Sequence, residues 1–250
     1  MSSKNFAIIP ARGGSKRIPN KNTKDFLGKP IISYSIEAAI KSQLFDRIIV
    51  STDDEKVANV ARKHGAEVPF FRPRSLADDF CGLDAVVQHA VEWICENDDA
   101  EYGYCCMIYA TAPMISEFYL RDSFNEIELV EYAGAVTVTE TSFPAQRCYQ
   151  IQKDNRLVRL WEEYTTVRSQ DLPPSYQDAA HFNWFNLAKW SYSEKQSIQH
   201  QIKPIVLPRW IVQDIDNEND WKMAELLFQV AQEFENQNEK HSNDHFGGFK

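Results

Sequence analysis

The stretch FAIIPARGGSKRIPNKN, residues 6–22, joins a short apolar run to a loop rich in glycine and basic residues. The run at 6–10 has the length and apolarity of a buried strand, and the loop begins where that strand ends. Gly13 and Gly14 let the backbone come close to a ligand, because neither has a side chain in the way. The loop also carries four cations, Arg12, Lys16, Arg17 and Lys21. This combination predicts a binding place for an anion.

The rest of the chain continues an alternation of apolar strands and amphipathic helices. Further strands are expected at 47–52, 104–110, 134–140 and 204–216, and helices from Pro30 onward and at 54–64, 84–95, 118–130 and 218–235. Strands that are apolar throughout and separated by such helices pair in parallel and carry helices on both faces. The sequence therefore predicts an α/β fold with a mostly parallel, Rossmann-like sheet.

The rhythm breaks in the middle of the chain, where prolines, aromatic residues and charges mix with little helical period. We therefore expect a discontinuous catalytic domain, 1–140 and 191–235, with an insertion of short strands and loops at 141–190. The polar residues 236–250 are expected to form a disordered tail.

Composition excludes some classes of function. The formal net charge of -9 argues against an extended nucleic-acid surface, which normally needs a basic face, but it allows a local basic pocket for a small anion. The five cysteines have no zinc-site spacing, and we expect free thiols that are mostly buried, as in a reducing compartment. No apolar run reaches the roughly 18 residues of a membrane helix, so the expected location is the cytoplasm.

Two acidic residues suggest what the anion is. Asp214 and Asp216 lie two apart near the end of the strand expected at 204–216, which would point both carboxylates to the same side. Mg²⁺ in proteins is typically held by one or two carboxylates together with substrate phosphates. The alternatives are a solvated basic turn for the loop and a helix cap for Asp216. Taken together, the loop and the acid pair favour a nucleoside triphosphate with a metal ion.

Most of the chain outside the tail resembles one enzyme family, the cytidylyltransferases that make CMP-activated nine-carbon sugar acids. The resemblance is carried by IIPARGGSKRIPNKN (8–22), GKPIISYSIEAA (28–39), DRIIVSTDDEKVANVARKHGAEVPFFRP (46–73), LADD (76–79) and VQDIDNENDW (212–221). Within the family, IYATAPM (108–114), FPAQRCYQ (143–150) and RSQDLPPSYQDAAHF (168–182) are most similar to the pseudaminic acid enzymes. A Gln-Pro-Thr-Ser-Pro-Leu-Arg stretch that is usual in the sialic acid enzymes is absent.

The resemblance implies a nucleotide-diphospho-sugar transferase fold and a reaction in which a sugar acid and CTP give CMP-sugar and pyrophosphate. It assigns the triphosphate to Arg12, Gly13, Gly14, Ser15 and Lys16, charge stabilisation at the α-phosphate to Lys21, and further nucleotide contacts to Asn22 and Arg72, with Arg72 at the cytosine edge. Asp214 and Asp216 would hold Mg²⁺. Lys21, Arg12 and the two acids are the expected catalytic residues.

The resemblance also implies that the insertion forms a homodimer interface and contacts the sugar. Arg168 and Gln170 match an Arg-x-Gln motif near the sugar, and Arg168 can pair with the sugar carboxylate. Tyr109 takes the place of a sugar-contacting glutamine, while Tyr176 and Trp184 are candidate wall residues for which packing is the alternative. His181 is expected to be packed rather than to act as a base. Ala180 replaces a glycine usual in the family.

Several functions remain open on the sequence. Pseudaminic acid is the first choice of substrate, and legionaminic, neuraminic and 3-deoxy-octulosonic acids are alternatives. A catalytically silent nucleotide-binding protein that keeps the fold is the alternative from another class.

Overall fold

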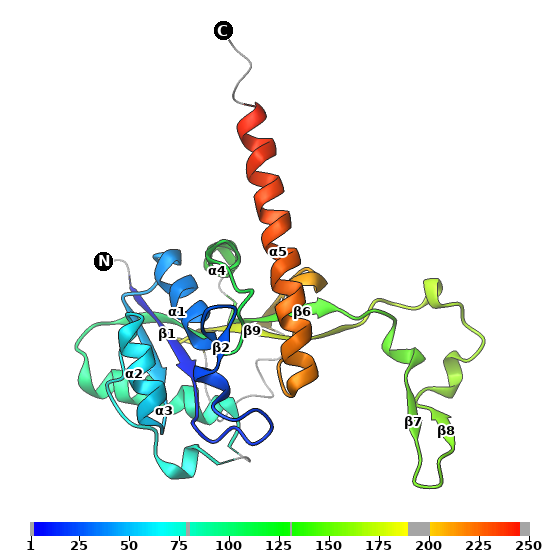
Figure 1. Cartoon of the computed structure of the whole chain (residues 1–250), viewed down its shortest axis with the longest axis horizontal. Helices are drawn as coiled ribbons and strands as arrows, with labels where there is room; N and C mark the ends of the chain where they lie inside the picture. The colour runs from blue at the N-terminus through cyan, green and yellow to red at the C-terminus, as the bar shows by residue number, and fades with distance from the viewer. Residues whose placement is uncertain (1–2, 79–80, 131, 190–200, 246–250) are drawn as a thin grey trace.

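The computed structural model describes residues 3–78, 81–130, 132–189 and 201–245. Its centre is a six-stranded sheet with the strand order β10-β6-β9-β5-β1-β4 (Figure 1). The strands are β1 (Lys4–Pro10), β4 (Arg47–Ser51), β5 (Tyr102–Ile108), β6 (Gly134–Glu140), β9 (Tyr176–Asn186) and β10 (Ile202–Val206). All neighbours pair in parallel except β9, which is antiparallel to both β5 and β6. The predicted mostly parallel α/β sheet is confirmed.

Helices cover both faces of this sheet. They are α1 (Ile31–Ser42), α2 (Glu55–Lys63), α3 (Leu83–Asn97), α4 (Glu117–Val130) and α5 (Glu218–His245). Along β1, Ala7 and Ile9 belong to a buried cluster with α1, α2, α4 and α5. Phe6 and Ile8 belong to a second cluster with α3. Because successive strand residues point to opposite faces, these two clusters are the two sides of the sheet.

Short elements complete the chain. A two-stranded ribbon of β2 (Asp25–Phe26) and β3 (Lys29–Pro30) precedes α1, and Pro30 is the N-cap of that helix rather than a residue of its first turn. Within the described residues, the 3₁₀ helices are Lys21–Thr23, Arg74–Leu76, Ala145–Arg147, Glu162–Tyr164, Ser169–Asp171 and Arg209–Ile211.

The insertion expected at 141–190 is shorter than predicted. Its last part forms β9, which is hydrogen-bonded on both sides within the sheet. Residues 141–175, called here the arm, lie outside the sheet and contain the hairpin of β7 (Tyr149–Ile151) and β8 (Leu157–Arg159). Figure 1 shows the arm projecting away from the sheet. The prolines just before β9 obscured this strand in the sequence, because they break the pattern where it begins.

Two further boundaries differ from prediction at the end of the chain. The strand expected at 204–216 ends at Val206, and Pro208 has no N–H with which to continue a ladder. Helix α5 was expected to stop at about 235, but it continues to His245. In the added part, 236–245, only Gln237, Glu239 and Lys240 are good helix formers, so composition did not predict this extension. Residues 246–250 of the expected tail lie outside the described residues.

The cysteines are all free, and Cys105 and Cys106 on β5 are buried. Cys95, by contrast, is exposed, so the prediction of buried thiols holds only in part. No helix within the described ranges is long and apolar enough to cross a membrane.

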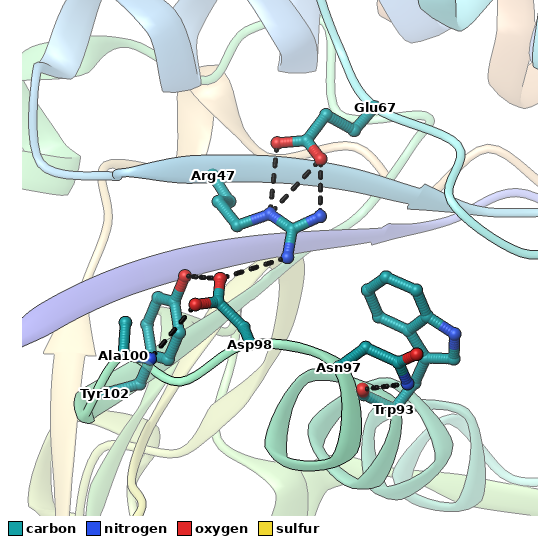
Figure 2. Close-up of polar contacts among 7 residues, drawn as sticks. All are labelled: Arg47, Glu67, Trp93, Asn97, Asp98, Ala100 and Tyr102. Carbon is teal, nitrogen blue, oxygen red and sulfur yellow. Dashed lines mark hydrogen bonds and ion pairs between the residues drawn. The ribbon is translucent and has the colours of Figure 1, made fainter.

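A polar cluster around Arg47 joins four segments at the amino-terminal edge of the sheet (Figure 2). Arg47 at the start of β4 donates to the Glu67 carboxylate, with Nε 3.1 Å from Oε2, and to Asp98 Oδ2 at 3.2 Å. Asp98 also accepts from the Ala100 N–H at 3.0 Å and the Tyr102 hydroxyl at 2.8 Å. These bonds, that from Ala100 above all, lower the pKa of Asp98. Burial and the bond to Asp98 raise the pKa of Tyr102 to about 12.

Replacing Arg47 by alanine is expected to lower the free energy of unfolding by about 2 kcal/mol, because several charge-assisted hydrogen bonds are lost at once. Urea denaturation of the purified protein measures this change. Arg156→Ala is the matched control, since Arg156 pairs only locally, with Asp154, at the surface of the arm. We expect no measurable change there. Equal stability of the Arg47 variant and the wild type would contradict a structural role for the cluster.

Candidate active site

The basic loop lies at the carboxyl ends of three parallel strands. β1 has β4 on one side and β5 on the other, so the strand order reverses at this point. Ligands of open α/β sheets bind at such a switch point, outside the carboxyl ends of the strands. The loop leaves β1 here and is tied to β4 by a hydrogen bond from Ala11 N–H to Ser51 O at 2.9 Å.

Apolar packing brings the acid pair to this loop. Ile18 of the loop and Ile215, which lies between Asp214 and Asp216, are both fully buried in one cluster. The other members of that cluster are Phe26, Ile31, Trp221 and Ala224. Burial of Ile215 holds the carboxylates on either side of it at the edge of the cluster, next to the loop.

Lys21 connects the two parts directly. Its Nζ donates to the Ile215 carbonyl at 2.6 Å and lies 3.8 Å from Asp216 Oδ1. Arg17 pairs with the same carboxylate oxygen at 2.8 Å. Arg17 had no assigned role in the site on sequence grounds, although its position in the cationic loop was a signal. The predicted juxtaposition of the basic loop and the acids is therefore present. The acids, however, lie on an irregular segment before α5 and not at the end of a strand.

Burial shifts the pKa of both a cation and an acid of this site. The pKa of Lys21 is lowered chiefly by burial, against the opposing effect of Asp216. The pKa of Asp214 is raised by burial and then by repulsion from Asp216. A divalent cation between these acids would relieve the repulsion, so the two residues fit a metal ion. No cluster of three or more His, Cys, Asp or Glu side chains suited to a metal occurs in the described part of the chain. Two carboxylates suffice where substrate phosphates supply further oxygens.

The other predicted loop residues lie around this point. Arg12 NH1 donates to the carbonyl of Asp78 at 3.0 Å, and its own carbonyl accepts from the Asn22 side chain at 2.9 Å. Asn22 is buried, whereas Gly14 and Lys16 are exposed and Ser15 is half-buried. The loop thus exposes Gly14 and Lys16 to solvent while Asn22 braces it from inside.

Arg72, expected at the cytosine edge, is only 6% exposed. Its Nε donates to Ser51 Oγ at 3.1 Å, and its NH2 donates to the Ser51 carbonyl. Burial lowers the pKa of Arg72 to about 10, although the Asp53 charge opposes this effect. Arg72 therefore braces the end of β4, and these two bonds limit how its guanidinium can turn towards a base.

Tyr109 is a predicted sugar residue that lies at the carboxyl edge of the sheet, directly after β5. Its N–H donates to the His181 carbonyl at 2.9 Å, and its carbonyl accepts from Ser35 Oγ at 2.7 Å. The pKa of its hydroxyl is raised by burial and by the carboxylates of Asp178 and Asp214. The phenol therefore stays protonated, as a donor near the acid pair. Asp178 had no predicted role on sequence grounds.

The remaining predicted sugar residues are not gathered at the loop. Arg168 and Gln170 are exposed on the arm, where Arg168 Nε donates to Asp171 at 2.7 Å. Tyr176 is half exposed at the start of β9. Trp184 is a correction: it is 1% exposed, packs in the core, and donates from Nε1 to Ser123 Oγ at 3.0 Å. It points into the sheet–helix core from the same face of β9 as Phe182, because residues two apart on a strand share a face. His181 is buried, as expected.

Ala180 occupies a backbone conformation that favours glycine. Its φ is 49°, in the left-handed region, at an irregularity where the register between β6 and β9 shifts. Asp178 Oδ1 accepts from the Ala180 N–H at 2.7 Å and stabilises this bulge. The bulge precedes His181, the partner of Tyr109, so it helps to shape the carboxyl edge of the sheet.

Ala180→Gly is expected to raise the free energy of unfolding by about 0.5–1 kcal/mol, because the Cβ penalty of the left-handed region exceeds the added chain entropy of glycine. Ala179→Gly, one position earlier and without positive φ, is the control and should destabilise. Urea midpoints with equal m-values measure both. A less stable Ala180→Gly variant would contradict the strain argument.

A fold with helices on both faces, a cationic glycine loop at its switch point and an acid pair beside Lys21 defines a nucleotide-dependent transferase. The chain belongs to the cytidylyltransferase family, whose model, described as "Cytidylyltransferase", matches residues 6–238. It is therefore a nucleotidyltransferase, and the resemblance seen in the sequence is confirmed.

Similar proteins agree with this membership. A pseudaminic acid cytidylyltransferase of Campylobacter jejuni is 41% identical over 230 residues, which cover 92% of this chain and 98% of that protein. A CMP-N,N'-diacetyllegionaminic acid synthase of Legionella pneumophila is 30% identical, covering 91% of this chain and 97% of that protein. The solved structure of a CMP:2-keto-3-deoxy-manno-octonic acid synthetase complexed with CTP has a TM-score of 0.63 at 18% identity, covering 92% of this chain and all of that one. This structure supports the fold.

Proposed function

We propose that the protein is a Mg²⁺-dependent cytidylyltransferase that joins CTP to a nine-carbon 2-keto sugar acid, with pseudaminic acid as the substrate. The observation that carries the proposal is the Lys21 contact: a cation of the glycine loop is bonded to the carbonyl between two acids. The 41% identity to a pseudaminic acid enzyme over nearly its whole length supports the choice of sugar. The product would be CMP-sugar, with release of pyrophosphate.

In the proposed reaction the anomeric hydroxyl oxygen attacks the α-phosphorus of CTP, and the bond to the pyrophosphate oxygen breaks. Such a transfer asks the protein chiefly to position the reactants and to stabilise charge. Arg12, the Gly13–Ser15 backbone and Lys16 would hold the triphosphate. Lys21 would stabilise the charge that develops on the α-phosphate, while Asn22 and Arg72 would support the nucleotide.

The acid pair would hold the metal ion. Asp214 and Asp216 fit because burial and then repulsion from Asp216 raise the pKa of Asp214, and a cation would relieve that repulsion. When bound, Mg²⁺ would supply neutralisation of phosphate charge. Arg17 and Lys21 would then share the Asp216 carboxylate with the ion. The same negative charge would therefore attract both the cations of the loop and the metal ion.

The expected location of the protein is the cytoplasm.

The sugar subsite is proposed to combine Tyr109 with residues of the arm. Exposed apolar side chains on the arm, Phe143, Tyr149, Ile151, Leu157 and Leu160, support burial of the arm in a homodimer. Arg168, Gln170 and Tyr176 would then reach the sugar from one subunit or the other.

The test is release of pyrophosphate from CTP and Mg²⁺ with a panel of sugar acids: pseudaminic, legionaminic, neuraminic and 3-deoxy-octulosonic. We expect the highest kcat/KM with pseudaminic acid and loss of release when EDTA removes the metal. Faster turnover of another acid would change the substrate assignment. Binding of CTP without turnover on any acid would instead support the catalytically silent protein.

A further inference from the structure

The turn at the end of β4, residues 51–54, contacts both parts of the proposed nucleotide site. Ser51 accepts from Ala11 N–H of the loop at 2.9 Å, and Thr52 O accepts from Arg72 N–H at 2.8 Å. The turn therefore lies between the loop proposed for the triphosphate and the arginine proposed for the base. None of its residues has a role in the reaction as described so far.

Asp53 makes the most direct contact with the loop. Its Oδ1 accepts a hydrogen bond from the Gly13 N–H at 2.9 Å. This amide is one of those that the proposed function turns towards phosphate, and here it is already bonded to a carboxylate. The positions of the loop amides that remain free to bind a ligand therefore depend on where Asp53 holds Gly13.

The neighbouring residue explains why the loop fits this turn so closely. Asp54 caps α2 by accepting from Lys56 N–H at 2.7 Å and Val57 N–H at 3.0 Å. A Cβ added to Gly13 would lie 2.5 Å from the Asp54 Cβ. Gly13 is therefore packed against the start of a helix, and only glycine allows the approach that its bond to Asp53 requires.

Asp53 also acts on Arg72. The guanidinium is held against Ser51 by hydrogen bonds, and the negative charge of Asp53 counteracts the burial that lowers its pKa. One carboxylate therefore accepts from a loop amide and opposes the effect of burial on the pKa of Arg72.

We propose that Asp53 is a positioning residue for the nucleotide: its hydrogen bond to Gly13 fixes the loop in the conformation that receives the triphosphate, next to Arg72. The inference rests on the proposed function of the loop, and it adds a residue to which neither the sequence analysis nor the reaction assigns a role. Asp53 itself need not touch CTP.

Simple electrostatics predicts the opposite effect of removing this residue. A carboxylate beside a bound triphosphate repels it, so loss of the charge alone should tighten CTP binding. If Asp53 positions the loop, removal of its side chain should weaken CTP binding, because the loop must then be ordered by the ligand. The sign of the change therefore separates positioning from repulsion.

The experiment compares Asp53→Ala and Asp53→Asn with the wild type by calorimetric titration of CTP and of pyrophosphate. Alanine removes the acceptor, and we expect about tenfold weaker binding of both ligands. Asparagine keeps an acceptor oxygen without the charge, and we expect affinity within about threefold of the wild type. In turnover assays the alanine variant should raise KM for CTP more than it lowers kcat.

The control is Glu55→Gln, which removes a carboxylate two residues away whose contact is with Arg62 at 3.5 Å on the exposed face of α2. It reports how much a nearby charge alone changes CTP affinity. Urea denaturation of each variant shows whether it is folded. If the alanine variant does not fold, Asp53→Glu replaces it, since the longer side chain keeps the charge but displaces the acceptor, and the same weakening is expected.

Unchanged or tighter CTP binding by Asp53→Ala would overturn the inference, and so would equal weakening by alanine and asparagine. Weakening by alanine with rescue by asparagine supports it. Failure of the proposed function is a different result, because it would appear in the wild type itself, either as no binding of CTP or as binding without turnover on any sugar acid.

Discussion

Lys21→Ala is expected to lower turnover at least about 100-fold while the fold is kept, the scale of effect seen when one group that stabilises developing charge is removed. The Lys21 side chain is 19% exposed and lies 3.8 Å from Asp216 Oδ1. It is thus an ordered cation in the site rather than a solvated surface residue.

Steady-state pyrophosphate release measures the Lys21 effect. Lys24→Ala is the matched control, because Lys24 pairs with Glu218 at 2.9 Å near the same helix end and should leave turnover close to the wild type. The pKa of Lys21 lies below the ordinary value of 10.5. As the pH is raised, wild-type activity should therefore begin to fall before pH 10.5 is reached, because the Lys21 ammonium loses its proton. Near-normal turnover of Lys21→Ala would remove Lys21 from the mechanism.

Asp216→Asn is expected to lower turnover by roughly 100-fold and to raise the Mg²⁺ concentration needed for half-maximal activity. The substitution keeps the shape of the side chain but removes the charge that Arg17 and Lys21 share. The carboxylate of Asp214, whose pKa is already raised, would be left alone to hold a cation.

Turnover measured across a series of Mg²⁺ concentrations tests the Asp216 prediction. Glu218→Gln removes a nearby acid that pairs with Lys24 outside the acid pair, and it should behave like the wild type. A variant at Asp216 with normal turnover and normal Mg²⁺ dependence would show that the metal, if required, is held elsewhere.

Much of the fold could be predicted from local pattern. The strands β1, β4, β5 and β6 were found because each is an apolar run that ends at a turn signal, and α1 to α4 because their buried residues recur at helical spacing. Prediction failed where the local sequence pattern did not reveal where an element begins or ends. β9 was hidden by preceding prolines, and α5 extends through polar residues that merely resemble a tail.

The candidate site divides in the same way. The glycine loop and its cations were visible, because residue type alone marks an anion site. Arg17 and Asp53 were not assigned roles, since each acts through a contact with a residue distant in the chain. Asp178 was not assigned a role because the bulge of β9 that its side chain stabilises could not be seen in the sequence. Trp184 was wrongly assigned to the sugar site, because the sequence does not show which face of the strand an aromatic residue lies on, and so does not separate a core residue from one that lines a binding site.

The amino-acid sequence by itself determined the alternation of strands and helices, the anion-binding chemistry of the loop and the presence of two acids, since these depend on residue type and short-range spacing. Only the tertiary structure decided that Lys21 meets the carbonyl of Ile215, 194 residues further along the chain. The physical reason is burial: Ile18 and Ile215 pack in the same apolar cluster, and that packing brings the cations and carboxylates beside them into one site.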